Sequence, residues 1–393
     1  MPATFGFRVA AADGAARAGQ MQTAHGLVET PAFMPVGTQG AVKAVTPRDL
    51  LDLGAGIILG NTYHLSLRPG DELVARLGGL HRFIGWDRPI LTDSGGYQAF
   101  SLGALRRLDE DGIVFRSHLD GSEHRLTPER AADIQARLGS DIAMVLDECL
   151  AHPATPEAAR VSMERTIRWA RRSRERFVAL QEGPQPAADG SSPVSLTTPG
   201  QAQFGIVQGS VYGDLREASV DKTAAIGFEG YAIGGLSVGE PVEVMYDVVS
   251  RTAPLLPADR PRYLMGTGTP EDLVESVARG IDLFDCVLPT RNARNGQLFT
   301  REGRLNVKNA RYADDGRPPD DECGCYTCRH FSRANLRHLF MAGEITGATL
   351  NTLHNLHFYL DTMRRIRDAI AFRSFENFRQ AFHQTLSRRR QDS

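Results

Sequence analysis

Eight short apolar segments recur along the sequence, and each of them ends in a glycine or a polar residue. In chain order they are PAFMPVGT, GIILGNTY, RPILTDSG, DIAMVLDE, FGIVQGS, GYAIGGL, RYLMGTG and DLFDCVLP. Nearly continuous apolar segments of this length are typical of strands that are buried on both faces, as in a parallel sheet.

Helix-start signals follow several of these segments. A threonine directly before a proline occurs at Thr46, Thr127, Thr155 and Thr269. The threonine hydroxyl can cap a helix, and proline suits its first turn. Strand, capped helix and strand in repetition indicate βα units, and eight strands favour a closed (β/α)8 barrel over an open sheet.

Two segments interrupt this repetition. Asp120-Gly121 lies between flanks that alternate polar and apolar residues over residues 115–126, which predicts a β-hairpin. Residues 182–200 are rich in proline, glycine, serine and alanine, and we expect them to form a disordered, flexible surface insertion.

Composition narrows the class of protein. The formal net charge of the 393-residue chain is -2, which gives no global reason to expect a nucleic-acid partner. No apolar run reaches the 18 residues or so of a membrane span, and the N-terminus does not resemble a secretory signal. Five unevenly placed cysteines do not form a disulfide framework. We therefore expect a soluble, reduced, cytoplasmic protein.

Polar residues cluster where the predicted strands end. Read in chain order, the residues at these strand ends are Asn61, Asp93, Asp147, Gln208, Gly234-Gly235, Met265-Gly266 and Asp285. In a βα barrel the carboxyl ends of the strands meet at one mouth, where chemistry takes place. A single aspartate there could merely cap a helix, as at Asp93, or pair with an arginine, as Asp285 could with Arg291. Together the residues indicate a carboxylate-dependent transferase or hydrolase that acts on a ring-shaped ligand.

A basic segment follows Asp285. It contains six cations against one acid, Glu302: Arg291, Arg294, Arg301, Arg304, Lys308 and Arg311. Such a segment could be a solvated loop, or it could contact phosphates beside the barrel mouth.

Residues 323–328 read CGCYTC. Cys325 and Cys328 have the spacing that lets two thiolates bind one ion, Cys323 adds a third ligand, and a tetrahedral zinc site needs one more. The histidines downstream are His330, His338, His354 and His357. His330 is too close to Cys328 for an easy fit, whereas a helix through LNTLHNLHFYL could present His354. A redox pair is less favoured because a thioredoxin-like βαβ context is missing, and a filled tetrahedron of three thiolates and one imidazole would be structural.

Several of these stretches occur together in one known family. TDSGGYQ, DEC, IVQGS, GGLSVGE, YLMGTGTPEDL and FDCVLPTRNARNGQLFT, followed by C-x-C-x-x-C and HNL, resemble the tRNA-guanine transglycosylases from about Phe33 to His357. The resemblance implies an irregular (β/α)8 TIM barrel with a small C-terminal zinc-binding subdomain. We place the barrel and N-terminal strands at 1–300, the zinc subdomain at 301–366, and a C-terminal helix with a basic tail at 367–393.

The resemblance also implies a reaction. These enzymes exchange the wobble guanine of tRNAs with a G-U-N anticodon (for aspartate, asparagine, histidine and tyrosine) in queuosine biosynthesis. Asp285 would be the nucleophile that attacks the ribose carbon, ionised at neutral pH if its pKa is the ordinary value of about 3.9. Asp93 would be the general acid and base.

The binding residues carry over as well. For the base, the resemblance implies a pyrimidine-edge pair, a backbone amide and carbonyl, and two side chains that sandwich the ring: Asp147 and Gln208, Gly235 and Leu236, Tyr97 and Met265. Arg291 and Arg294 would contact the anticodon loop. One zinc ion would be bound by Cys323, Cys325, Cys328 and His354.

The finer specificity rests on fewer residues. Cys149 and Val238 look like the bacterial type, which inserts 7-aminomethyl-7-deazaguanine, while Ser237 stands where alanine is common. A queuine-inserting version is the alternative. Less favoured are a barrel glycoside hydrolase with Asp93 and Asp285 as acid and nucleophile, and a non-catalytic tRNA-binding partner of a heteromeric enzyme. The bacterial family implies a homodimer.

Overall fold

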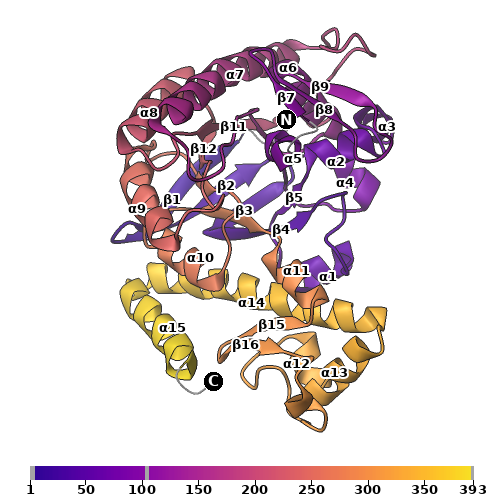
Figure 1. Cartoon of the computed structure of the whole chain (residues 1–393), viewed down its shortest axis with the longest axis vertical. Coiled ribbons are helices and arrows are strands. Elements are labelled where there is room, and N and C mark those ends of the chain that lie inside the picture. Colours follow the sequence, from indigo (N-terminus) through magenta and orange to yellow (C-terminus); the bar gives the residue numbers. More distant parts are fainter. Residues whose placement is uncertain (1–4, 102–105, 391–393) are drawn as a thin grey trace.

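A computed structural model describes residues 5–101 and 106–390. The eight apolar segments form a closed barrel of parallel strands, as predicted (Figure 1). In barrel order the strands are β4 (Ala32–Gly37), β5 (Ile58–Gly60), β6 (Ile90–Thr92), β10 (Ile142–Met144), β11 (Ala202–Val207), β12 (Gly230–Ile233), β13 (Arg262–Leu264) and β14 (Leu283–Cys286). Pairing of β14 with β4, from Leu283 opposite Ala32, closes the ring.

The apolar character of the strands is explained by burial on both faces. Every residue of β4 and of β11 is buried. Phe33, Phe204 and Phe284 are among the largest fully buried side chains and belong to one core cluster. Apolar burial of this kind is the main stabilising contribution to such a fold.

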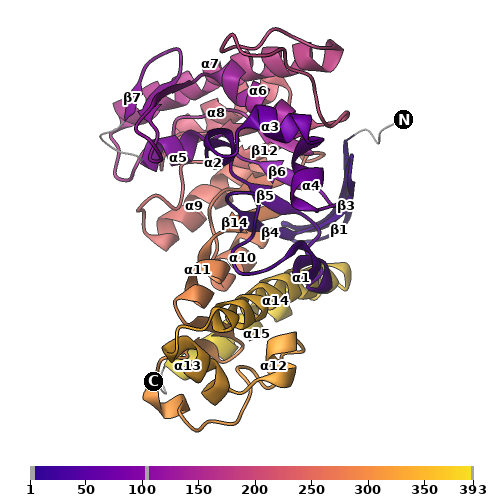
Figure 2. The ribbon, with the colours of Figure 1, turned by 90° about the vertical axis from the view of Figure 1, so that its right-hand side faces the viewer.

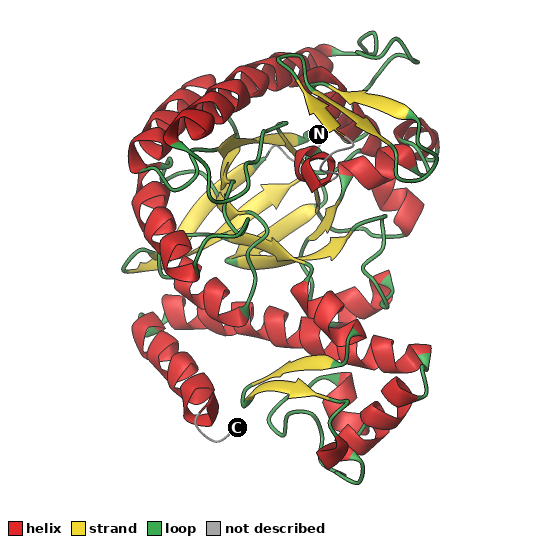
Figure 3. Ribbon diagram, in the orientation of Figure 1, coloured by secondary structure: helices red, strands yellow, loops and turns green. Residues whose placement is uncertain are grey.

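Helices form a ring outside the strands (Figure 3). Four of them begin at the predicted threonine-proline pairs: α1 (Pro47–Asp52), α6 (Pro128–Leu138), α7 (Pro156–Glu182) and α10 (Pro270–Val277). In each case the threonine hydroxyl accepts a hydrogen bond from the backbone N–H three residues on, as in Thr269 with Asp272 N at 3.2 Å. The remaining barrel helices are α2 (Thr62–Leu67), α3 (Asp71–Arg76), α4 (Gly79–Ile84), α5 (Gly96–Ser101), α8 (Gly213–Ile226), α9 (Val242–Thr252) with the 3₁₀ turn η2 (Ala253–Leu255), and α11 (Leu288–Arg294).

Two small antiparallel sheets are added to the barrel. The first contains β1 (Gly6–Asp13), β2 (Ala16–Thr23) and β3 (Gly26–Thr30). The second contains β7 (Arg106–Leu108), β8 (Ile113–Arg116) and β9 (Glu123–Leu126), and the turn between β8 and β9 holds the predicted Asp120-Gly121 pair. Gly121 has a φ of 75°, which explains the glycine.

A buried carboxylate connects the first sheet to the barrel end opposite the mouth. Asp141, directly before β10, lies 2.9 Å from His25 Nδ1 and 2.9 Å from His81 Nε2, and it also accepts the backbone N–H groups of His25 and Ile90. The two imidazole rings stack at 3.5 Å with 16° between their planes. Burial by itself would raise the pKa of Asp141, but the hydrogen bonds from both histidines lower it below its usual range.

Residues 182–200 differ from the expectation of a disordered insertion. Gln185 and Val194 exchange two backbone hydrogen bonds of 2.9 and 2.8 Å. The Val194 side chain is fully buried against Ala136 and Leu180, and Thr198 Oγ1 donates to Gly139 O at 2.6 Å. The polar composition gave no sign that Val194 would be buried, with Ala187 and Leu196 packed beside it, or that local polar contacts would form; together these fix the segment on α6 and α7.

The C-terminal part contains β15 (Gln297–Thr300), β16 (Gly303–Asn306), the 3₁₀ turn η3 (Ala310–Tyr312), α12 (Tyr326–His330), α13 (Arg333–Met341), α14 (Ile345–Ala371) and α15 (Phe375–Arg390). Its small core includes Leu298, Leu305 and Leu336. In Figures 1 and 2 the long helix α14 lies between the barrel and the rest of this unit, which comprises the β15–β16 hairpin, α12 and α13. The expected boundary at 300/301 falls inside the β15–β16 hairpin, and the one at 366/367 falls inside α14. No helix in the described ranges is both long and apolar enough to cross a lipid bilayer.

Candidate active site and metal centre

The polar residues predicted at the strand ends lie at one mouth of the barrel, because all eight strands run parallel. Asp93 follows β6, Asp147 follows β10, Gln208 follows β11 and Asp285 lies in β14. All four side chains are buried or almost so. Their charges act on one another, since Asp285 raises the pKa of Asp93 and Asp93 raises that of Asp147.

Asp93 is surrounded by donors from neighbouring segments. Its Oδ1 accepts from Thr62 N at 2.9 Å, and its Oδ2 accepts from Gln98 Nε2 at 2.8 Å and from Asn61 Nδ2. Burial raises the pKa of Asp93 to about 6, although these hydrogen bonds oppose the shift. A carboxyl group with a pKa near neutrality can both release and accept a proton, as general acid–base catalysis requires.

Asp285 has a different environment. Its Oδ1 accepts two hydrogen bonds, from Tyr263 OH at 2.5 Å and from Gly266 N at 2.8 Å. The pKa of Asp285 is not the ordinary value assumed from the sequence: burial raises it, and the two hydrogen bonds only partly offset this effect. Both donors bind Oδ1, and Oδ2 accepts no hydrogen bond from the described residues.

Asp147 and Gln208 form a pair. Gln208 Nε2 donates to Asp147 Oδ2 at 2.8 Å, and burial raises the pKa of Asp147 to about 6 despite this bond. Backbone approaches the pair closely, because a Cβ added at Gly235 would lie 2.2 Å from Gln208 Oε1 and one at Gly234 2.7 Å from its Nε2. Gly235 also has a φ of 67°. The glycines are therefore required by space and conformation, beyond forming a tight turn.

The two residues expected to sandwich a ring differ in exposure. Tyr97, in α5, is 53% exposed, and Met265, directly after β13, is half-buried against the barrel core. Leu236, which follows the glycine pair, is buried. All three lie on segments that extend from the strand ends at the mouth.

Two residues of the site were missed by the sequence reasoning. Tyr263 donates a hydrogen bond to Asp285. Side chains in a strand alternate between its two faces, so the position of Tyr263 two residues before Met265 could have indicated that both side chains point to the same side. Arg216, in α8, is fully buried and donates to the carbonyls of Val207 at 3.0 Å and Gly234 at 2.8 Å, which fixes the ends of β11 and β12. Burial lowers the pKa of Arg216 to about 10. Nothing local in the sequence marks this arginine.

The basic residues after Asp285 do not form one continuous surface that is available to phosphates, because most of their side chains contact other parts of the protein. Arg291 is exposed in α11, and the half-buried Arg294 donates to Thr290 O at 2.9 Å. Arg301 is engaged by Glu322 at 2.5 Å. Arg304, Lys308 and Arg311 lie over the aromatic rings of Phe299, Phe340 and Tyr312.

The cysteines and a histidine form a separate group in the C-terminal unit. Cys323, Cys325, Cys328 and His354 present four ligand atoms close together. The Sγ atoms lie 3.8, 3.6 and 3.2 Å from His354 Nδ1, close to the edges of a tetrahedron with metal bonds of about 2.0–2.3 Å. His354 Nε2 is 2.7 Å from Phe299 O, to which it can donate, and this leaves Nδ1 for a metal. The four residues fit a zinc ion, and His330, His338 and His357 are not among them.

Comparison with known proteins gives a consistent result. The family model of queuine tRNA-ribosyltransferase matches residues 13–388. The chain is 56% identical over 379 residues to the queuine tRNA-ribosyltransferase of Syntrophobacter fumaroxidans, with 96% of each protein covered. It is 58% identical over 365 residues to that of Aromatoleum aromaticum (93% and 94% covered), and 53% identical over 378 residues to that of Zymomonas mobilis (96% and 94% covered).

Proposed function

Since this chain belongs to the queuine tRNA-ribosyltransferase family, and is therefore a tRNA-guanine transglycosylase and a pentosyltransferase, we propose that it replaces the wobble guanine of G-U-N tRNAs by double displacement. The observation that carries the proposal is the arrangement at the barrel mouth. One buried carboxylate has its Oδ1 held by two donors, a second has a pKa of about 6, and a carboxylate–amide pair lies beside them.

In the first step Asp285 Oδ2 forms a bond to C1′ of the ribose while the bond from C1′ to N9 of guanine breaks. Asp93, when protonated, supplies the proton that the departing guanine needs. In the second step N9 of the incoming base forms a bond to C1′, the bond from C1′ to Asp285 breaks, and the carboxylate is released. Asp93 accepts the proton from the incoming base, so that both protons and charges balance.

We propose that the remaining mouth residues bind the base. Asp147 accepts from the donors on the pyrimidine edge of guanine and Gln208 donates to it. The Gly235 N–H binds the carbonyl oxygen, and the Leu236 carbonyl faces the substituent of the five-membered ring. Tyr97 and Met265 stack on the two faces of the base. The side chain of Tyr97 is exposed in the structure, and a bound base would cover it.

Tyr263→Phe tests how Asp285 is held. Loss of the 2.5 Å hydrogen bond removes a donor that stabilises the charged carboxylate, so the pKa of Asp285 rises further. The nucleophile must be ionised, so the acidic limb of the rate–pH profile is expected to move to higher pH. The kcat at neutral pH should fall by roughly 10-fold or more. An unchanged profile in the folded variant would show that Tyr263 has no such role.

For the RNA we propose contacts from Arg291 and Arg294 to the anticodon loop. Both lie on α11, which follows Asp285 directly, and Arg291 is exposed. We propose 7-aminomethyl-7-deazaguanine as the incoming base because Cys149 and Val238 look like the bacterial type. Queuine is the alternative, and the tRNAs for aspartate, asparagine, histidine and tyrosine are the expected substrates.

We propose that one zinc ion is bound by Cys323, Cys325, Cys328 and His354, where it stabilises the C-terminal unit. Four protein ligands leave no position for water or substrate, so the ion takes no part in the reaction. None of the five cysteines takes part in a disulfide bond, and we propose that the enzyme works in the cytoplasm.

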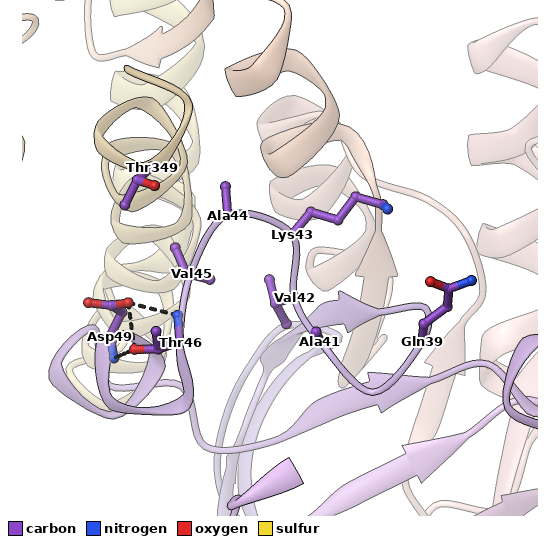
Figure 4. Close-up of a pocket in the computed structure, with 9 residues that line it drawn as sticks. All are labelled: Gln39, Ala41, Val42, Lys43, Ala44, Val45, Thr46, Asp49 and Thr349. Atoms are coloured by element: carbon purple, nitrogen blue, oxygen red, sulfur yellow. Dashed lines mark hydrogen bonds between the residues drawn. The ribbon is translucent and has the colours of Figure 1, made fainter. Parts of the chain in front are cut away.

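We propose a homodimer in which the second copy covers the surface around the start of α14. A pocket of about 420 Å³ lies there between the loop after β4 and α14, and Figure 4 shows Thr349 facing Val45 and Thr46 across it. Ile345, one helical turn before Thr349, is 81% exposed. A second copy seated over the pocket would bury this apolar side chain at the interface.

Ile345→Arg is expected to convert the dimer to a monomer, because the interface would have to bury an unpaired charge. Light scattering coupled to size-exclusion chromatography measures this directly. Phe372→Arg is the matched control, since Phe372 is equally exposed but lies at the other end of α14. Equal masses for the two variants and the parent protein would contradict this interface.

The proposed function is tested by incorporation of labelled guanine into unmodified tRNA with a G-U-N anticodon. 7-Aminomethyl-7-deazaguanine and queuine are added as competitors, and inhibition by the aminomethyl base alone is the expected result. A glycoside hydrolase would release free sugar and need no acceptor base, whereas a non-catalytic partner would bind tRNA without incorporation. Either outcome with folded, zinc-loaded protein would overturn the proposal.

A further inference from the structure

Two hydroxyl groups connect the loops that follow β12 and β13. Ser237 Oγ lies 2.9 Å from Thr267 Oγ1, although the two residues are 30 positions apart in the chain. Both hydroxyls also contact Met245 Sδ, at 3.6 and 3.7 Å. Thr267 is 1% exposed, so its hydroxyl is removed from solvent and depends on these partners.

Of these two loops, the one after β13 is fixed by contacts to several neighbouring segments. Tyr359, a fully buried residue of α14, donates to Gly268 O at 2.6 Å. Gly266 N binds Asp285, and the cap formed by Thr269 and Asp272 begins α10 directly afterwards. Thr267 therefore occupies a position that is fixed on both sides.

The loop after β12 has a strained conformation. Ser237 is one of few described non-glycine residues with a positive φ, at 58°. Its backbone N–H and that of Val238 donate to the Glu240 carboxylate, at 2.5 and 3.0 Å. Arg216 holds the start of the same loop through the carbonyl of Gly234. Ser237 Oγ adds the contact to the fixed neighbouring loop.

The peptide between Leu236 and Ser237 is thus held from its C-terminal side. In a planar trans peptide the carbonyl of Leu236 points opposite to the N–H of Ser237. Because this N–H binds Glu240, the carbonyl is directed away from Glu240. The contact between Ser237 Oγ and Thr267 fixes the position of the Ser237 Cα atom, which is one of the two Cα atoms that bear this peptide.

We propose that the Ser237–Thr267 hydroxyl pair positions the Leu236 carbonyl and thereby favours a base that carries an amine-bearing substituent over guanine, which lacks one. The inference rests on the proposed function, in which this carbonyl faces the substituent of the five-membered ring. Ser237 and Thr267 are positioning residues, because they act through the peptide and touch no reacting atom.

The test compares Ser237→Ala, Thr267→Val, Thr267→Ser and the Ser237→Ala/Thr267→Val double variant. For each, KM and kcat are measured with unmodified tRNA and either guanine or 7-aminomethyl-7-deazaguanine. Both single variants that remove a hydroxyl should raise KM for the aminomethyl base about three- to tenfold, the size expected from loss of one hydrogen bond. KM for guanine and kcat with either base should change less than about twofold.

Two further comparisons separate positioning from general stability. Thr267→Ser keeps the hydroxyl and should restore the preference, and the double variant should be no worse than either single one. Thr252→Val is the matched control: Thr252 is fully buried in α9, and within the described ranges its hydroxyl has no hydrogen-bond partner.

The inference is overturned if KM rises equally for both bases, if the two single effects add, or if Thr267→Ser behaves like Thr267→Val. Failure of the proposed function gives a different pattern, since the unaltered protein would then incorporate neither base.

Discussion

Asp285→Asn is expected to abolish the covalent adduct between protein and RNA, while the variant still binds tRNA. An amide is a poor nucleophile compared with a carboxylate. The Oδ2 atoms of Asp93 and Asp147 both accept hydrogen bonds from neighbouring side chains, whereas the two donors to Asp285 bind its Oδ1. The expected loss in kcat is about 10³-fold or more. The adduct is measured by denaturing gel electrophoresis after incubation with tRNA in the absence of a second base.

The asparagine side chain can preserve the local structure. Its Oδ1 can accept from Tyr263 OH and Gly266 N as the carboxylate does, so the mouth need not rearrange. Asp87→Asn, at an exposed position, controls for loss of one negative charge. An adduct that still forms in Asp285→Asn would exclude Asp285 as the nucleophile and would direct attention to Asp93 or Asp147.

The barrel was predictable because its signals are local. Each strand is a short apolar run that ends in a glycine or polar residue, and four helices begin at a threonine followed by a proline. These patterns follow from burial on both faces and from capping, which need no knowledge of distant contacts. The segment 182–200 shows the limit, because composition could not reveal that Val194 would be buried.

The site was predictable only in part. Strand ends identify Asp93, Asp147, Gln208 and Asp285, since parallel topology brings such ends together. The hydrogen bonds and the burial of these residues depend on contacts between distant segments, such as Tyr263 with Asp285 and Arg216 with Gly234. The same is true of the raised pKa of Asp285, which arises from burial by the assembled barrel.

Cys325→Ser is expected to remove the zinc ion and to destabilise the C-terminal unit before it affects the chemistry. Cys325 has two roles, because its side chain also caps α12 by accepting from Cys328 N at 3.3 Å. Serine is a good N-cap residue, so this substitution retains the cap and removes only the thiolate ligand. The unit has a core of few residues, and a structural zinc ion contributes directly to the folding free energy of such units.

Zinc content by mass spectrometry and thermal unfolding measure the two effects. Ser332→Ala is the matched control, since Ser332 caps α13 in the same unit by accepting from Asn335 N at 3.1 Å. That variant should retain zinc and lose only about 1 kcal/mol, whereas Cys325→Ser should lose zinc and about 3 kcal/mol or more. A metal-free Cys325→Ser protein that melts and turns over like its parent would contradict a structural role for the ion.

The order of the effects follows from the contacts of α14. His354 fixes this helix to the cysteines, and its neighbour Asn355 donates to Pro289 O, while Asn351 donates to Ala293 O. Both acceptors belong to α11, the helix that carries Arg291 and Arg294. Loss of zinc should therefore disturb the proposed RNA contacts first, so that KM for tRNA rises while kcat changes little. A fall in kcat at unchanged KM would instead indicate that the disturbance reaches Asp285 through Tyr359 and Gly268, which lie on the other path from α14 to the mouth.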